Sequence, residues 1–302
     1  MGQFLSIGIP VKNEEESIDQ TIESLISSDA WRRAKSNREL IVCLNGSTDG
    51  TREVLEGLKA RLPELRIIFS ETGHGKTGAI NEIAKRANPR TREIYFSDGD
   101  ILVEKETISR TLEALKERGI EFAAPSIWPL RKEKKATLTE AMYEEAIAFA
   151  ARERIQSLTG MGFAVRRNFL LKNPLPHGRR INDDRFINYA YSGKIRMVYG
   201  ARVLFRAPTF ADHYRARVRH RRQKRIMFRE FPWLRESAIQ LSKQRNPRVL
   251  SFFNSLSTKA KAGFVMNQVA ELVASITART RARDPWPKIQ STKIGAKRNF
   301  PK

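Results

Sequence analysis

Glu93-Ile-Tyr-Phe-Ser-Asp-Gly-Asp100 has the form of a short strand, Glu93–Ser97, that ends in two carboxylates, Asp98 and Asp100. Two carboxylates one residue apart repel each other, and a divalent cation between them offsets that repulsion. Mg²⁺ and Mn²⁺ prefer oxygen ligands, which they commonly share with the phosphates of a substrate. The segment therefore predicts a metal-bound diphosphate at the end of a strand. A solvated turn is the alternative, since Asp and Gly are also ordinary turn formers.

Strands and helices alternate on both sides of this segment, over residues 4–127. The expected strands are Leu5–Pro10, Leu40–Leu44, Arg66–Ser70, Ile94–Ser97 and Phe122–Ile127. The expected helices are Ser17–Ser28, Thr51–Leu62, Thr77–Ala87 and Lys105–Arg118. This alternation predicts an α/β fold with a mainly parallel sheet and helices on both faces. Ligands of such sheets bind beyond the carboxyl ends of the strands, so we expect the chemistry in the loops there.

The remainder of the chain is less regular. After the charged stretch Arg131–Lys135, the pattern predicts a helix over Leu138–Gln156 and strands over Met161–Val165 and Arg196–Phe205. Beyond Asp212 the sequence is helical and basic. An amphipathic stretch at 264–277 has on one side Val265, Val269, Leu272 and Ile276. Residues 281–302, with two prolines and many basic residues, are expected to form a loose tail.

Net charge is distributed unevenly along the chain. The 302 residues carry a formal charge of +23, of which residues 211–302 supply +17 through 22 Lys and Arg and 5 Asp and Glu. A basic C-terminal region indicates an anionic partner, such as a membrane surface, a nucleic acid or an acidic polymer. A solubilising surface explains the charge equally well.

The apolar residues give no sign of a membrane-spanning segment or a secretory signal. No apolar run approaches the ~18–20 residues that cross a bilayer, and we expect no signal peptide at the N-terminus. The single cysteine, Cys43, cannot form a disulfide within the chain, which fits a reducing compartment. We therefore expect a cytoplasmic protein, with peripheral attachment to the inner face of the membrane as an option.

Three further loops follow the predicted strands. Pro10–Glu15 follows the first strand and Asn45–Thr51 the second, where it opens a helix. Small polar residues at a helix N-terminus offer N–H groups and hydroxyls to an anion or a nucleobase, although they also serve as ordinary helix caps. Gly73–Gly78 follows the third strand, and its Lys76 could reach a phosphate.

Gly75-Lys76-Thr77 after a strand also suggests the phosphate-binding loop of a nucleotide hydrolase. That loop requires a glycine five residues before Gly75, where this chain has Ser70, and it normally follows an early strand rather than the third. A P-loop NTPase is therefore a weaker alternative. A further alternative is a non-catalytic basic protein that binds nucleic acid or membrane, although such a protein has no need of carboxylates at strand ends.

A series of short motifs over about residues 4–225 resembles, in order and spacing, the family 2 glycosyltransferases of the GT-A fold. The motifs are Ser6–Glu15, Asn45–Thr51, Gly75–Asn81, Asp98–Asp100, Gly160–Arg167, Asp183–Asp184 and Gly193–Val198. Three positions depart from the family pattern: Asn45 replaces an Asp, Asp183 replaces a Glu, and no Trp follows Arg221–Arg225. The first departure leaves the nucleotide open, and the last is not typical of a processive polysaccharide synthase.

The resemblance implies a GT-A domain at 1–210, with a nucleotide-sugar half at 1–127 and an acceptor half at 128–210, then a basic helical extension at 211–302. It implies inverting, metal-dependent transfer of a sugar from a nucleotide diphosphate to a hydroxyl of a saccharide or lipid-linked saccharide. The pair Asp183-Asp184 would supply the base, with Asp184 as the acting residue. The Mg²⁺ or Mn²⁺ ligands would be Asp100 and Asp98, with His213 as a further ligand.

Two groups of binding residues follow from the same resemblance. The nucleotide-sugar group comprises Pro10, Lys12, Glu14, Asn45, Ser47, Asp49, Lys76, Asn81 and Asp98. The acceptor or diphosphate group comprises Gly160, Met161, Gly162 and Arg221. Nucleic acid is not expected as a partner, and an anionic membrane surface is an option for residues 211–302. Donor sugar, acceptor, linkage and oligomeric state stay open at this point.

Overall fold

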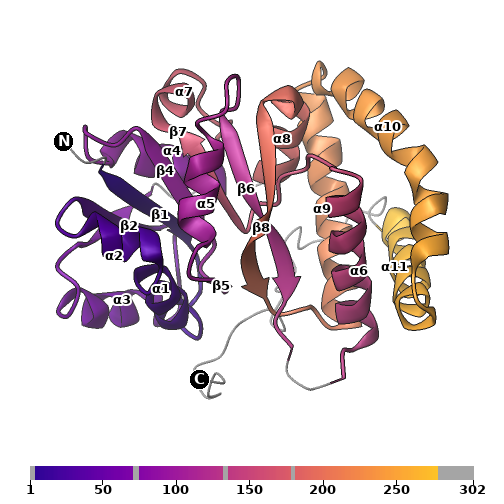
Figure 1. The fold of residues 1–302 in the computed structure, drawn as a ribbon, viewed down its shortest axis with the longest axis horizontal. Helices are drawn as coiled ribbons and strands as arrows, with labels where there is room; N and C mark the ends of the chain where they lie inside the picture. The colour runs from indigo at the N-terminus through magenta and orange to yellow at the C-terminus, as the bar shows by residue number, and fades with distance from the viewer. Residues whose placement is uncertain (1–3, 71–74, 132–134, 178–180, 278–302) are drawn as a thin grey trace.

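The computed structural model describes residues 4–70, 75–131, 135–177 and 181–277, without the side chains of residues 244–247 and 276–277. Gly73 and His74 of the third predicted loop lie outside the described residues, as do part of the charged stretch and the whole predicted tail. Within the described ranges, one eight-stranded sheet carries helices on both faces (Figure 1).

The N-terminal half of the sheet is parallel. The strands of the sheet are β1 (Leu5–Val11), β2 (Arg38–Leu44), β3 (Leu65–Phe69), β4 (Glu93–Ser97), β5 (Ile101–Val103), β6 (Phe122–Pro129), β7 (Gly162–Arg166) and β8 (Ile195–Phe205). Their spatial order is β3-β2-β1-β4-β7-β6-β8-β5. β1 pairs in parallel with β2 and β4, and β2 with β3. The loops after these four strands therefore lie at one edge of the sheet, where ligands of such folds bind.

The other half of the sheet is mixed. β7 runs antiparallel to both of its neighbours, β4 and β6, and β5 runs antiparallel to β8, whereas β6 and β8 are parallel. The predicted parallel arrangement is thus confirmed for the N-terminal half, and the complete sheet is mixed. β4 and β7 pair from Glu93 with Arg166 to Ser97 with Gly162. This pairing places the residues after β4 beside the residues before β7.

Two apolar layers hold helices against the sheet. The helices of these layers are α1 (Ile18–Ile26), α2 (Asp29–Ala34), α3 (Thr51–Lys59), α4 (Gly75–Arg86), α5 (Thr107–Ala114), α6 (Leu138–Arg152), α7 (Arg167–Lys172) and α8 (Asp183–Ala190). Successive strand residues point to opposite faces. Leu40 and Val42 pack with α1, α3 and α5, whereas Ile41 and Cys43 pack with α4, α7 and α8. This alternation explains why the strands are apolar throughout.

Three short elements are absent from the sequence prediction: α2, α7 and β5. α2 and α7 have 6 residues each and β5 has 3, so none is long enough to show a helical or strand period. The predicted helix Lys105–Arg118 is shorter in the structure, because its last turns unwind before Gly119, whose φ is +82°.

The basic C-terminal region forms three helices, α9 (Phe210–Glu230), α10 (Leu234–Ser255) and α11 (Thr258–Thr277). α11 packs against α6 and α9, and α10 packs against α8 (Figure 1). These helices therefore pack on α6 and α8, beside the sheet. None of the helices in the described ranges has the length and apolar character needed to cross a membrane.

Candidate active site

The loops after β1 and β2 are bonded to each other. The N–H of Asn13 donates to Ser47 Oγ at 3.1 Å, and the N–H of Thr48 donates to Asn13 Oδ1 at 2.8 Å. The N–H of Gly50 donates to Glu15 Oε2 at 2.6 Å. These bonds join the two predicted nucleotide loops into one surface beside the start of α3.

The predicted nucleotide ligands in these loops differ in their hydrogen bonding and in their exposure. Asp49 accepts a hydrogen bond from Thr51 Oγ1 at 2.5 Å and another from the loop after β1 at 3.3 Å, so it fixes the start of α3. Asn45 is half-buried, and its side chain makes no hydrogen bond with any part of the chain that the structure describes. Lys12 is exposed and Pro10 is half-buried. Asn45 is therefore the side chain best placed to meet a ligand here.

Asp98-Gly99-Asp100 forms the turn between β4 and β5. A Cβ atom on Gly99 would lie 3.0 Å from Cγ of Glu14, so the glycine lets the predicted ligand Glu14 lie against the turn. The N–H of Asp98 donates to the carbonyl oxygen of Met161 at 2.9 Å. The structure therefore brings the predicted metal ligands next to the loop predicted to bind the acceptor.

Lys76, at the start of α4, contacts three oxygen atoms. Its Nζ lies 2.6 Å from Asp98 Oδ1 and 2.9 Å from Asp183 Oδ2. It also donates to the carbonyl oxygen of Gly160 at 2.8 Å. The contacts with Asp98 and Asp183 are ion pairs, and the contact with Gly160 is a hydrogen bond. Burial alone would lower the pKa of Lys76, but Asp183 and Asp98 outweigh burial and raise it. Lys76 is therefore a charged cross-link between α4, β4 and α8.

Two features depend on this cross-link. The pKa of Asp98 is raised to about 6, first by burial and then by the negative charges of Asp100 and Asp183, while Lys76 opposes the rise. A Cβ atom on Gly160 would lie 2.9 Å from Asp183 Oδ2 and 3.1 Å from Lys76 Nζ. A side chain at position 160 would therefore push the carboxylate and the ammonium apart.

Asp184 lies in the first turn of α8 but does not cap it. The cap is Asn182, whose Oδ1 accepts a hydrogen bond from the N–H of Arg185 at 2.9 Å. Oδ1 of Asp184 is buried and has no hydrogen-bond partner among the described residues. Burial, and then the charge of Asp183, raises the pKa of Asp184 to about 6. A buried carboxylate oxygen with a pKa closer to neutrality is suited to accept a proton.

Asn188 fixes α8 against the segment before β7. Its Nδ2 donates to the carbonyl oxygen of Leu158 at 2.7 Å, and its Oδ1 accepts from the N–H of Leu158 at 2.9 Å. The same Nδ2 donates to the carbonyl oxygen of Asp184 at 2.7 Å. The helix that carries Asp184 and the loop with the predicted acceptor residues Gly160, Met161 and Gly162 are therefore held together.

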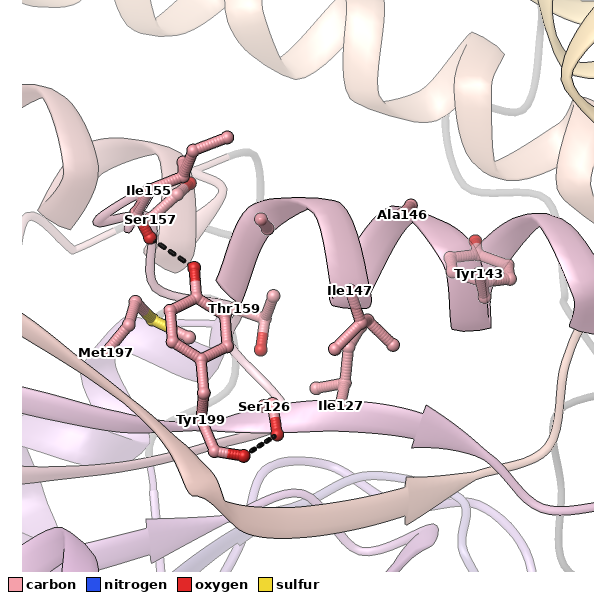
Figure 2. Close-up of a pocket in the computed structure, with 11 residues that line it drawn as sticks. Ser126, Ile127, Tyr143, Ala146, Ile147, Ile155, Ser157, Thr159, Met197 and Tyr199 are labelled. Carbon is pink, nitrogen blue, oxygen red and sulfur yellow. Dashed lines mark hydrogen bonds between the residues drawn. The ribbon is translucent and has the colours of Figure 1, made fainter. Parts of the chain in front are cut away.

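A cavity of about 190 Å³ lies beside this loop, between α6 and the strands β6 and β8 (Figure 2). Its wall includes Ile155, Ser157 and Thr159. Leu158, which lies between two of these residues, is hydrogen-bonded to α8, and Gly160, which follows Thr159, accepts a hydrogen bond from Lys76. Thr159 Oγ1 is buried without a hydrogen-bond partner in the described ranges. The segment thus separates an apolar cavity from the carboxylates.

Arg219 of α9 faces the four carboxylates of what we call the acidic cluster: Asp98, Asp100, Asp183 and Asp184. Burial lowers the pKa of Arg219, and the cluster opposes that change. The predicted residue Arg221 instead pairs with Glu271 of α11 at 2.8 Å. Positions two apart on a helix differ by about 200°, so the two arginines point to nearly opposite sides. The sequence alone does not show which of the two arginines points to the acidic cluster, because this depends on the rotation of α9 about its axis.

Two other predicted ligands are engaged in packing. Asn81 donates to the carbonyl oxygen of Leu175 at 2.7 Å and accepts from its N–H at 3.0 Å, which braces α4. His213 Nε2 lies against the side-chain amide of Asn267 of α11 and 3.1 Å from Arg217 Nε. Burial, and then Arg217, lowers the pKa of His213. In this arrangement both side chains hold elements together.

The acidic cluster fits a divalent cation that is shared with a substrate. Its four carboxylates face Lys76, Arg185 and Arg219, which leaves an excess of one negative charge. In the described ranges, no group of three or more His, Cys, Asp or Glu side chains could hold a metal ion unaided. Mg²⁺ commonly binds one or two carboxylates together with substrate phosphates. Asp98 and Asp100 fit such a shared site and do not fit an all-protein metal centre.

The family model for glycosyl transferase family 2 matches residues 6–173, more than half of the 302 residues. The chain belongs to glycosyl transferase family 2. The match runs from β1 to α7, so it includes Lys76, the turn Asp98–Asp100 and Gly160. This result favours a glycosyltransferase over the P-loop NTPase and over the non-catalytic basic binder.

Two curated relatives are similar to part of this family 2 chain. Glycosyltransferase AglE of Haloferax volcanii is 26% identical over 124 residues, which are 41% of this chain and 39% of the relative. A beta-monoglucosyldiacylglycerol synthase of a Synechocystis species is 27% identical over 136 residues, 44% of this chain and 26% of the relative. The chain spans less than half the length of each of these relatives.

A solved structure is similar over most of the family 2 chain. Mannosyltransferase PcManGT from Pyrobaculum calidifontis, in complex with GDP-Man and Mn²⁺, has a TM-score of 0.57 and 16% identity. The match covers 89% of this chain and 86% of that chain. At this identity the likeness shows the fold alone, and it confirms the GT-A fold predicted from the sequence.

Proposed function

We propose that this chain is an inverting, metal-dependent glycosyltransferase. It would move a sugar from a nucleotide diphosphate to a hydroxyl group of a saccharide or a lipid-linked saccharide. The observation that carries the proposal is Oδ1 of Asp184, which is buried without a hydrogen-bond partner among the described residues and belongs to the acidic cluster. Membership of glycosyl transferase family 2 supplies the class of reaction.

In the proposed reaction Asp184 is the base. The acceptor oxygen forms a bond to the anomeric carbon while the bond from that carbon to the diphosphate oxygen breaks, and the acceptor proton passes to Asp184 Oδ1. Attack from the face opposite the diphosphate inverts the configuration. A pKa of about 6 leaves Asp184 mostly ionised at pH 7 and still more basic than an exposed aspartate.

The acidic cluster would manage the charge of the leaving diphosphate. Mg²⁺ or Mn²⁺ bound to Asp100 and Asp98 would supply positive charge where the diphosphate develops negative charge. Arg219 supplies a further positive charge that faces the cluster. The structure of PcManGT contains GDP-Man and Mn²⁺, which supports testing both with this chain.

We also propose the division of the chain that its sequence suggests. Residues 1–127 would bind the nucleotide sugar, residues 128–210 the acceptor, and residues 211–302 would form a basic extension. The bonded loops after β1 and β2 support the first assignment, and the position of Asp184 beside the loop at Gly160 supports the second. The apolar cavity beside Thr159 would receive a part of the acceptor that does not react. A cytoplasmic location fits these assignments.

The test is donor binding and transfer over a panel of UDP-, GDP- and dTDP-sugars with Mn²⁺ or Mg²⁺. We expect metal-dependent binding of one sugar nucleotide and its loss in Asp100→Asn. Asp184→Asn should bind that donor and lose turnover by about 100-fold or more. Glu113→Gln is the matched control, because Glu113 is an exposed carboxylate on α5.

Two outcomes would count against the proposal in different ways. Full turnover by Asp184→Asn would refute the base assignment while leaving the reaction class intact. Failure of every sugar nucleotide to bind, with or without metal, would refute the function itself.

A further inference from the structure

The inward face of α11 consists of small residues and of Phe264, which packs against Phe252 and Phe253 of α10. Ala260, Gly263, Ala270 and Ala274 are buried, and α11 packs against α6 and α9. A Cβ atom on Gly263 would lie 2.3 Å from the carbonyl oxygen of Leu138, so the glycine allows α11 to touch the start of α6. Small side chains let two helix backbones approach closely, but they bury little apolar surface.

Polar contacts fix which face of α11 points inward. Asn267 is bonded to His213 of α9. Glu271 pairs with Arg217 at 2.9 Å and with Arg221 at 2.8 Å, both also on α9. Glu271 is the single acidic residue of α11, so its charge is neutralised on the inward side. These contacts determine the rotation of the helix about its axis.

Apart from Phe264, the large apolar residues in the described part of α11 point outward as a result. The outer face of α11 consists of Val265, Met266, Val269, Leu272 and Val273. Each of these side chains is between 36% and 65% exposed. Their spacing of i, i+1, i+4, i+7 and i+8 places them on one stripe of the helix. A surface helix normally turns its apolar residues inward, whereas α11 has five of them outside and only Phe264, among small and polar residues, inside. Such contiguous exposed apolar surface marks an interaction site.

We infer that the outer face of α11 docks on an anionic lipid surface. Lys259 and Lys261 lie at the N-terminal end of the helix, about 80° to either side of the middle of the stripe. The sequence that continues from α11, residues 278–302, contains eight Lys and Arg and one Asp. An apolar helix face bordered by basic residues is the pattern of a helix that lies in the plane of a bilayer interface.

The same charges disfavour the other candidates for covering this face. A second copy would bring one strongly basic region against another, which electrostatic repulsion opposes. The chain's own residues 278–302 carry the same sign of charge as Lys259 and Lys261. An anionic leaflet satisfies both the apolar stripe and the basic border. This inference does not depend on the proposed reaction.

Vesicle binding by the full-length protein tests the inference. We expect co-flotation with vesicles of equal parts phosphatidylcholine and phosphatidylglycerol, little binding to pure phosphatidylcholine, and weaker binding at high salt. Val269→Gln with Leu272→Gln should weaken binding by about tenfold or more, because both side chains would leave the lipid. Leu171→Gln is the matched control, since Leu171 is an exposed leucine on α7, far from α11 in Figure 1. Equal binding by the double variant and the wild type would overturn the inference.

A charge control separates the basic border from net charge. Lys259→Gln with Lys261→Gln should weaken binding to the anionic vesicles. Lys59→Gln with Lys105→Gln removes the same charge from two exposed positions outside the C-terminal helices, at the end of α3 and just before α5. This control should have little effect on binding. Equal loss in the two double variants would show that net charge alone drives binding, which would overturn the role of α11.

A single fluorescent label identifies what covers the face. Cys43 is fully buried, and burial raises its pKa to about 12, so a thiol introduced by Leu272→Cys would be labelled selectively. An environment-sensitive dye there should shift to the blue on addition of anionic vesicles, and the same dye at Leu171→Cys should not. A blue-shifted dye before vesicles are added would overturn the inference. If that early shift depended on protein concentration, a second copy of the protein would cover the outer face of α11. If it did not, another part of the same chain would cover it.

Discussion

Nζ of Lys76 lies 2.9 Å from Oδ2 of Asp183, which joins the half of the chain that carries the nucleotide loops to the half that carries the proposed base. The same ammonium contacts Asp98 and the backbone at Gly160. A change at any of these positions should therefore affect both halves of the site.

Lys76→Met should remove this cross-link while keeping a long side chain. The acidic cluster would then lose one of the cations that face it. We expect kcat/KM to fall about 100-fold or more, and the free energy of unfolding to fall by about 2 kcal/mol, because unpaired carboxylates would stay partly buried. Steady-state kinetics and urea denaturation measure the two effects. Lys85→Met, at an exposed position of α4, is the control. Similar losses in both variants would contradict the cross-link.

Below about pH 6, kcat/KM should decline. Burial raises the pKa of Asp184 to about 6, so this carboxyl is ionised at pH 7 and takes up a proton on acidification. The groups that face Asp184 are Asp183, Arg185, Lys76 and Arg219. Because the protonated carboxyl cannot act as the base, the decline should approach about tenfold per pH unit. A rate that stays constant down to pH 5 would exclude Asp184 as the base.

Asp184→Asn should make the protein more stable at pH 7. The pKa of Asp184 is about 6 in the folded chain against an ordinary 3.8, so its ionised form costs free energy on folding. That cost is absent below about pH 4, where the carboxyl is protonated in both states, grows between pH 4 and 6, and is constant above. We expect a gain of about 1–3 kcal/mol at pH 7 and almost none at pH 4, by urea denaturation. A gain of the same size at both pH values would rule out this origin.

Gly160→Ala should impair catalysis with little effect on folding. The new methyl group would meet Asp183 Oδ2 at 2.9 Å and Lys76 Nζ at 3.1 Å. We expect kcat/KM to fall about tenfold or more, since small displacements of reacting groups are costly. Gly193→Ala is a close control, because no heavy atom lies within 4 Å of the Cβ it would add. The reverse ranking of the two variants would show that position 160 is not coupled to the acidic cluster.

The sequence was sufficient for the layout of strands and for the place of the site. Apolar strands such as Leu40–Leu44 and Glu93–Ser97 are buried on both faces, so their patterns are unambiguous, and parallel strands necessarily end at one edge. What a local pattern cannot show is the partner of a side chain. The motif that contains Lys76 predicts a phosphate ligand, and only the folded chain reveals that its ammonium group already contacts Asp98, Asp183 and Gly160.

The basic C-terminal helices show a second limit of sequence reasoning. An arginine-rich helix has no apolar stripe to set its phase, so Arg219 and Arg221 look equivalent until α11 occupies one side of α9. For α11 the sequence correctly places Val265, Val269 and Leu272 on one side. Apolar residues normally face a core, but here that side is occupied by alanines, a glycine, Phe264 and the polar residues Asn267 and Glu271.

The hydrogen-bonded ladder between β4 and β7 is continuous from Glu93 with Arg166 to Ser97 with Gly162. In enzymes that close by a hinge motion, two domains rotate about a few linking residues. Here such a rotation would break the hydrogen bonds between β4 and β7, which hold the turn after β4 beside the loop before β7. We therefore expect the two halves of the sheet to move as one rigid unit, so that substrates enter and leave without a rotation of one half against the other.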